Sequence, residues 1–237
     1  MIAKFPLLHR MVSWFDSFPC ALCDKALPVR DSGLCRECFE AIPFINGIKC
    51  HACGGELDGT LKVCSKCTRE EEREWADAYA LFRMEGIGRE LIHKFKYSKH
   101  LFVGRTIALE IIENMNPQFM EDVDFIVPVP LHWMRFFTRG FNQSEIIARI
   151  LADSFDLPCS SFLKRSRYTQ KQAKFNRKIR KQNLIDAFSI KKGVNCRKCT
   201  ILLVDDVLTT GSTLSAAAEV LLEAGAEKIK VLVAARA

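Results

Sequence analysis

The stretch ILLVDDVLTTGSTL, residues 201 to 214, joins a strongly apolar run to two adjacent carboxylates and a loop rich in hydroxyl groups. An apolar run of this kind is typical of a buried strand in a parallel sheet. In such sheets the binding residues lie at the carboxyl ends of the strands, where the helices begin. Asp205 and Asp206 occupy that end of the predicted strand. Two buried neighbouring acids are costly unless a cation or hydroxyl donors stabilise them, so the pair predicts a ligand-binding site.

The loop after the two acids has the composition of a phosphate-binding turn. Backbone amides at a helix start attract anions, hydroxyl side chains add donors, and Gly211 permits unusual dihedral angles. A phosphorylated sugar would satisfy both the acids and the loop. The plainer alternative is a strand-to-helix turn capped by Ser212 or Thr213, which leaves the paired acids unexplained. The chain contains no G-x-x-x-x-G-K-[ST] motif, which argues against a P-loop nucleoside triphosphatase.

Strands and helices alternate on both sides of this stretch. Apolar strands are predicted at 78–84, 123–130, 200–207 and 228–235, and helices at 88–97, 104–115, 142–155 and 212–226. Pro128 and Pro130 should stop their strand, and Asn142 is the expected N-cap of its helix. The apolar faces of the first two helices are expected to consist of Leu91, Ile92 and Phe95, and of Ile107, Leu109, Ile111 and Ile112. The alternation predicts an α/β domain with a mainly parallel sheet.

Eight of the eleven cysteines form four Cys-x-x-Cys pairs before residue 68. Two such knuckles can close a tetrahedral zinc site, so four predict two structural Zn2+ ions with no open coordination position. Sequential pairing gives one site of Cys20, Cys23, Cys35 and Cys38 and another of Cys50, Cys53, Cys64 and Cys67. A cross-braced pairing and a redox relay are the alternatives.

Composition and charge narrow the class of protein further. A hydrophobic content of 49% supports a packed core, and no apolar run approaches the roughly 20 residues that span a bilayer. Paired thiols without a secretory signal indicate a reducing compartment, so we expect the cytoplasm. We predict a zinc-ribbon domain at 1–72 and an α/β domain at 76–237. Residues 164–198 hold 13 Lys and Arg against one acid, which favours a polyanionic partner.

The segment VDDVLTTGST resembles the signature of type I phosphoribosyltransferases, which bind phosphoribosyl pyrophosphate (PRPP) with Mg2+. In that family the acids hold the ribose 2′- and 3′-hydroxyls, and the loop holds the 5′-phosphate. The resemblance therefore implies PRPP binding by Asp205, Asp206, Thr209, Thr210, Gly211, Ser212 and Thr213.

Three further blocks are similar to the competence protein ComF family: LIHKFKY, VPVPLHWMRFFTRGFNQSE and RSRYTQKQAKFNRKIRKQNLIDAF. The cysteine-rich start is similar to that family too. By this resemblance the 127–130 turn lies against the pyrophosphate, and the pyrophosphate-side residues are Val129, Pro130, Arg139 and Gly140. The basic stretch 165–183 corresponds to the mobile loop that covers the site in such folds.

The resemblance implies a protein that handles incoming single-stranded DNA during natural transformation. We expect the basic segment to bind that DNA, with phosphate contacts from Lys171, Lys174, Arg177 and Arg180. DNA-uptake helicases and recombination proteins are the expected protein partners. One hypothesis is a phosphoribosyltransferase, an enzyme of the glycosyltransferase class, whose acceptor the sequence does not identify. The alternative is a non-enzymatic adaptor that senses PRPP or a nucleotide while it binds DNA.

Overall fold

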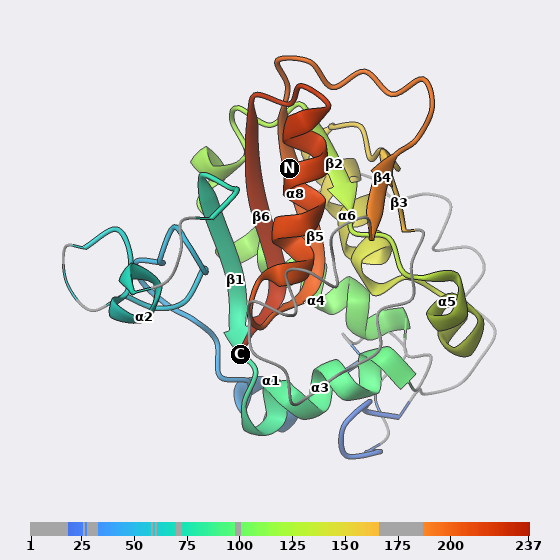
Figure 1. Cartoon of the computed structure of the whole chain (residues 1–237). Coiled ribbons are helices and arrows are strands. Elements are labelled where there is room, and N and C mark those ends of the chain that lie inside the picture. Colours follow the sequence, from blue (N-terminus) through green and yellow to red (C-terminus); the bar gives the residue numbers. More distant parts are fainter. Residues whose placement is uncertain are drawn as a thin grey trace.

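Four parallel strands form the centre of the molecule, in the order β1-β6-β5-β2 (Figure 1). Their bounds are β1 (Asp77–Arg83), β2 (Phe125–Pro128), β5 (Thr200–Leu208) and β6 (Lys228–Arg236). The computed structural model describes residues 19–25, 27, 33–57, 59, 61–69, 73–97, 101–165 and 187–237. The strand positions agree with the sequence prediction, and β2 ends at Pro128 as expected.

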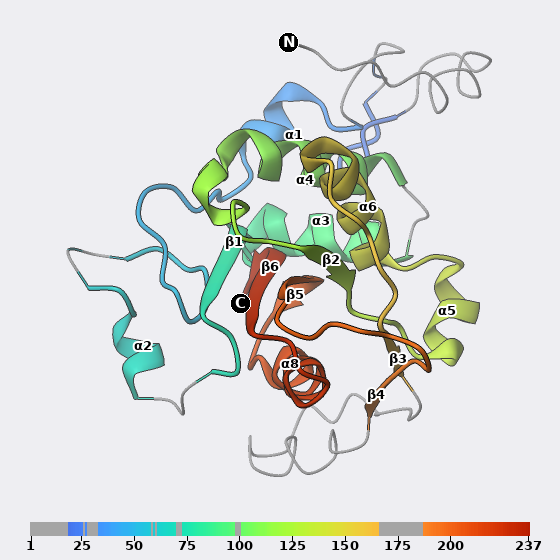
Figure 2. The same cartoon turned by 90° about the horizontal axis from the view of Figure 1, so that it is seen from above.

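Helices cover both faces of this sheet (Figure 2). On one face lie α3 (Gly86–Tyr97), α4 (Leu101–Asn114) and α6 (Gln143–Phe155), and on the other lies α8 (Ser212–Glu223). Leu202 and Val204 pack toward the first group, whereas Ile201 and Leu203 pack toward α8. Burial on both faces explains why the β5 sequence is uniformly apolar rather than alternating. The predicted α/β class with a mainly parallel sheet is confirmed.

Several small elements were not evident from the sequence. They are α1 (Arg36–Glu40), α2 (Ser65–Thr68), the 3-10 turn η2 (Pro117–Phe119), α5 (Trp133–Arg139), and the antiparallel strands β3 (Leu163–Arg165) and β4 (Phe188–Ile190). Helix α5 was not predicted because its aromatic residues face solvent, so its sequence lacks the periodic apolar stripe of a helix with one buried face. Of the residues expected on apolar helical faces, Ile112 is partly buried and Leu109 is 37% exposed, because Leu109 lies on the outer side of α4; the others are buried. Among the residues that the structure describes, no helix is long and apolar enough to cross a membrane.

The two cysteine-rich ribbons pack on opposite faces of the sheet. The first ribbon, built on Cys20, Cys23, Cys35 and Cys38, joins the core beside α3, α4 and α6. The second ribbon, built on Cys50, Cys53, Cys64 and Cys67, joins the core beside α8. Between them the chain crosses the β1 edge, where Ile45 N donates to Leu81 O (2.8 Å) and Arg83 N donates to Pro43 O (2.9 Å). The ribbons are therefore integral parts of the two hydrophobic cores.

Candidate functional site

The site begins where β2 stops and leaves one side of β5 open. β2 pairs with β5 only as far as Pro128 opposite Val204, and Val129 N adds one last bond to Val204 O (2.9 Å). Strand β5 continues to Leu208 beside β6, which is two residues beyond the predicted acidic end. Proline cannot donate to the sheet, so Pro128 and Pro130 end β2 just before the level of Asp205. The two acids consequently lie at an open edge of the sheet.

The two acids have different partners that compensate their charge. Asp205 Oδ1 accepts hydrogen bonds from Ser144 Oγ (2.9 Å) and from the amide of Asp206 (2.8 Å). Asp206 Oδ2 lies 3.1 Å from Lys96 Nζ on α3, and the two side chains are only 12% and 18% exposed. From the sequence, the paired acids require a cation or hydroxyl donors as partners. The fold supplies the cation Lys96 for Asp206 and the hydroxyl donor Ser144 for Asp205. Lys96 and Ser144 lie in the blocks LIHKFKY and RGFNQSE, but sequence reasoning gave neither a role.

Burial is the main cause that raises the pKa of Asp205 to about 6, and the charge of Asp206 raises it further. Bonds from the Asp206 amide and from Ser144, together with the charge of Lys96, oppose this rise. Asp205 is therefore ionised above about pH 6 and then needs additional hydrogen-bond donors or a cation. Sugar hydroxyls and Mg2+ are ligands of that kind.

The phosphate loop, residues 209–213, turns directly from β5 into α8. The helix cap is Gly211 at φ 82°, and it provides no side-chain cap. The plainer expectation of a cap by Ser212 or Thr213 is therefore wrong. Thr210 Oγ1 and Ser212 Oγ lie 3.0 Å apart within the loop, and Thr209 is exposed. Amides at the start of a 12-residue helix and adjacent hydroxyls form an arrangement that suits a phosphate group.

Arg73, which precedes β1 in the chain, contacts the phosphate loop. Arg73 Nη1 donates to Thr210 O (2.8 Å), and its guanidinium lies 5.3 Å from the centre of the Trp75 ring. Trp75 in turn donates from Nε1 to Ala52 O (3.1 Å), within the second ribbon. A side chain at Gly211 would overlap Arg73, so glycine is required both for the backbone angle and for this contact. No sequence signal marked Arg73 as a neighbour of the loop.

The segment Asn142-Gln143-Ser144 fixes the surroundings of the acids. Asn142 caps α6, as predicted, by accepting from Ser144 N (3.2 Å), and its Nδ2 donates to Val129 O (3.0 Å). Gln143 is buried and donates to Phe95 O on α3 (3.3 Å). These contacts tie α6, the turn after β2 and α3 together, so they hold Ser144 and Lys96 beside the acids.

The four expected pyrophosphate-side residues form two pairs, one in the turn after β2 and one at the end of α5. Val129 is buried, and Pro130 lines an open pocket of about 310 Å3 beside α5. Arg139 is 7% exposed, donates to Gln143 Oε1 (3.3 Å) and lies over the Tyr97 ring. Gly140 ends α5 in the left-handed conformation at φ 80°.

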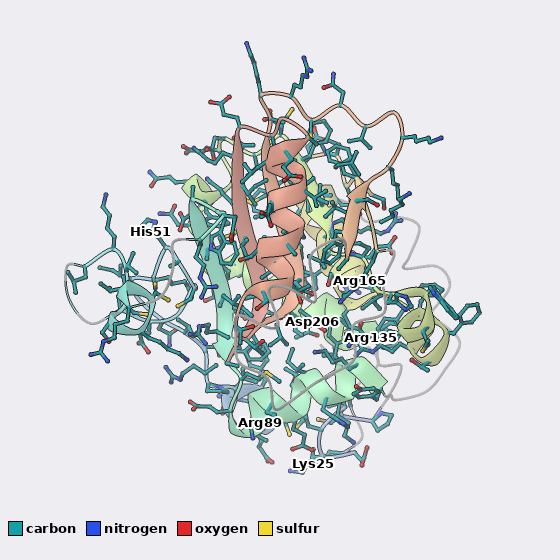
Figure 3. The ribbon with its side chains drawn as sticks, in the orientation of Figure 1. Lys25, His51, Arg89, Arg135, Arg165 and Asp206 are labelled. Atoms are coloured by element: carbon teal, nitrogen blue, oxygen red, sulfur yellow. The ribbon has the colours of Figure 1, made fainter. Side chains whose placement is uncertain are left out.

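Two other arginines face the acidic edge, and sequence reasoning gave them no specific role. Figure 3 shows Arg135, from α5, and Arg165, from β3, at the same end of the sheet as Asp206. Burial and the charge of Arg135 lower the pKa of Arg165, whereas the charge of Asp205 raises it. Arg165 also lies 5.2 Å from the centre of the Phe188 ring. Cationic groups thus stand on the β2 side of the acids, where an anionic part of a ligand would be favoured.

Both ribbons have the geometry of tetrahedral zinc sites. In each sequential group of four cysteines, all Sγ atoms lie within 4.8 Å of one another. The Cys23–Cys35 and Cys53–Cys64 sulfur separations are 3.6 and 3.9 Å, close to the ~3.8 Å expected between thiolates that are 2.3 Å from a tetrahedral zinc. Cys35 N and Cys64 N donate to Cys20 Sγ and Cys50 Sγ at equivalent positions. The pairing is sequential rather than cross-braced, and the donor sets fit structural Zn2+.

The predicted DNA contacts cannot be placed in this framework. Lys171, Lys174, Arg177 and Arg180 lie outside the described residues. The chain leaves the described part at Arg165 and returns at Ala187, next to the paired strands β3 and β4.

Comparison with known proteins adds two domain matches and several relatives. The model of the phosphoribosyl transferase domain matches residues 141–237, and that of the double zinc ribbon domain matches residues 17–68. Competence protein F of Haemophilus influenzae is 31% identical over 94% of this chain and 99% of its own. DNA utilization protein YhgH of Escherichia coli is 31% identical over 90% and 94%, and competence protein ComFC of Bacillus subtilis is 27% identical over 82% and 80%. These matches confirm a phosphoribosyltransferase-type domain preceded by a double zinc ribbon.

Proposed function

Because the chain belongs to the competence protein F (ComF) family, we propose that it handles incoming single-stranded DNA in natural transformation and binds PRPP with Mg2+. The observation that carries the PRPP proposal is the pair Asp205 and Asp206 beside a loop that leads into α8 through its N-cap, Gly211. The names of the relatives, competence protein and DNA utilization protein, support the role in DNA uptake.

Each part of PRPP has a matching group in the proposed site. The ribose hydroxyls would donate to Asp205 and Asp206, and the 5′-phosphate would accept from the phosphate loop. The pyrophosphate and its Mg2+ would lie toward the turn at 127–130. Arg135 and Arg165 would supply positive charge there. The residues on the pyrophosphate side of the site would be Val129, Pro130, Arg139 and Gly140. Bound Mg2+ would neutralise part of the charge on the pyrophosphate.

The proposed chemistry is displacement of pyrophosphate at the ribose C1 carbon by an acceptor. The protein would act mainly by positioning the reactants and by stabilising charge. The alternative is an adaptor that binds PRPP or a nucleotide without turnover and couples that binding to DNA. Release of pyrophosphate with candidate acceptors would support the enzyme, whereas binding without release would support the adaptor.

Calorimetric titration of PRPP and Mg2+ tests the sugar-phosphate site. The double substitution Asp205→Asn/Asp206→Asn should abolish binding, because an amide replaces each carboxylate. The matched control Asp153→Asn/Asp156→Asn removes the same charge from exposed positions at the end of α6 and should bind as the wild type does. A zinc-loaded, folded wild type that does not bind PRPP would refute this part of the proposal.

The basic segment is the proposed phosphate-contact region for single-stranded DNA. Replacement of Lys171, Lys174, Arg177 and Arg180 by Ala should weaken binding of a single-stranded oligonucleotide. It should also reduce the slope of log affinity against log salt by up to about three, at roughly 0.7 per lost phosphate contact. An unchanged affinity and salt slope would refute this assignment.

The remaining assignments follow from the same reasoning. Residues 1–72 and 76–237 are proposed as the two domains, with each ribbon packed against one of the two hydrophobic cores. Eight thiols in two zinc sites suit a reducing compartment, which supports a cytoplasmic location. DNA-uptake helicases and recombination proteins are the proposed classes of protein partner.

A further inference from the structure

Helix α5 presents three aromatic side chains to solvent. We call Trp133, Phe136 and Phe137 the aromatic platform; they are 59%, 48% and 81% exposed. These residues occupy two successive turns of one short helix. A concentration of exposed aromatic area of this kind marks an interaction surface rather than ordinary surface variation.

The platform is held in place by its own helix ends. His132 caps α5 by accepting from Met134 N (3.3 Å), and at the other end Gly140 N donates to Phe136 O (2.7 Å). The Trp133 and Phe137 rings meet edge to face, with centres 6.0 Å apart. Burial and the charges of Arg165 and Arg135 lower the pKa of His132, which favours the neutral ring that the cap requires. The two cap bonds and the ring contact thus place Trp133 and Phe137 side by side on the exposed face of α5.

Positive charge borders the aromatic platform. Arg135 belongs to the same helix, and the adjoining pocket of about 310 Å3 is lined by the three aromatic residues together with Arg165 and Lys191. Glu145 also lines this pocket, but its carboxylate is 2.7 Å from Arg149 and is therefore compensated. Aromatic faces beside guanidinium groups match the two components of a single strand, its bases and its phosphates.

We propose that α5 is a stacking platform for single-stranded DNA, with bases on Trp133 and Phe137 and phosphates near Lys191. This inference rests on the proposed DNA function and gives it a defined surface. A duplex would not fit the same surface, because its base faces are covered by their neighbours.

Fluorescence anisotropy with the zinc-loaded full chain tests the platform. The probe is a labelled oligothymidylate of about 20 nucleotides, compared with an abasic strand of equal length. Trp133→Ala/Phe137→Ala should weaken binding of the oligothymidylate by about 10- to 100-fold and leave the abasic strand unaffected. The control Ile48→Ala/Leu61→Ala removes side chains of similar exposure (65% and 64%) outside α5 and should have no effect. Trp133→Phe should retain affinity, because a ring is still present.

The possible outcomes separate this inference from the function on which it rests. A wild type that binds no oligothymidylate would refute the single-stranded DNA function and the platform with it. Wild-type binding that Trp133→Ala/Phe137→Ala leaves unchanged would refute the platform alone and would make α5 a contact surface for another protein. Equal losses on the thymidylate and abasic strands would also contradict the proposal, because a phosphate contact rather than base stacking would then be lost.

Discussion

Substitution of Gly211 by alanine tests how the second ribbon supports the phosphate loop. The added methyl group meets three obstacles: the backbone angle of 82°, the guanidinium of Arg73 and the Trp75 ring, whose nearest carbon would lie 3.2 Å away. A left-handed non-glycine residue costs about 1–2 kcal/mol. Displacement of Arg73 also removes its bond to Thr210 O, and hydrogen bonds of charged groups contribute about 1.5–3 kcal/mol. The free energy of unfolding should therefore fall by about 3–5 kcal/mol.

A matched glycine separates the two contributions. Gly193 has φ 80° and nothing within 4 Å of where its Cβ would lie, so Gly193→Ala should lose only the backbone contribution of about 1–2 kcal/mol. Urea unfolding of both variants gives the comparison. In an Arg73→Ala background, the extra cost of Gly211→Ala over Gly193→Ala should become smaller, because only the Trp75 ring then remains close to the methyl group. Equal losses for the two glycine variants in the wild-type background would refute the reasoning, since Arg73 would then move aside without loss.

Three further predictions concern the acids and the zinc sites. The pKa of Asp205 is raised to about 6, so the folded state holds this proton more tightly than the unfolded chain does. The resulting contribution to the free energy of unfolding is fully present below about pH 4 and is lost as the pH rises through 6. Asp205→Asn should therefore stabilise the unliganded chain at pH 8 by up to ~3 kcal/mol and hardly at all at pH 4, measured by urea unfolding. Lys96→Met should lower the free energy of unfolding by about 2–4 kcal/mol at pH 8, because Asp206 loses its partner. The control Lys94→Met, on the same helix, should have little effect. Equal losses for the two variants would contradict this account. Cys50→Ser and Cys20→Ser should each lower the zinc content from two ions to one, measured with a chromogenic chelator. Only Cys50→Ser should also weaken PRPP binding, by about tenfold, because the second ribbon contacts Trp75, and Arg73, which lies over the Trp75 ring, contacts the phosphate loop. Equal losses of PRPP affinity for Cys50→Ser and Cys20→Ser in calorimetry would refute that link.

Local sequence patterns were sufficient for much of this protein. The apolar run before Asp205 predicted β5, the prolines at 128 and 130 predicted the end of β2, and Asn142 predicted the start of α6. These features depend on side-chain period, on backbone donors and on capping, which act between residues close in sequence. The spacing of the cysteine pairs likewise predicted two metal sites, because four thiolates on two knuckles meet the geometric demand of zinc.

Tertiary structure alone decided what surrounds the acids and the loop. Lys96, Ser144 and Arg73 are separated from their partners by 110, 61 and 137 positions in the chain (206 − 96, 205 − 144 and 210 − 73), so no local pattern announces these contacts. The same holds for the position of the two ribbons on opposite faces of the sheet, which follows from the crossing of the chain at the β1 edge. A sequence period specifies which side of an element is buried. Which side chains then meet depends on how the elements pack, and that is a property of the whole chain.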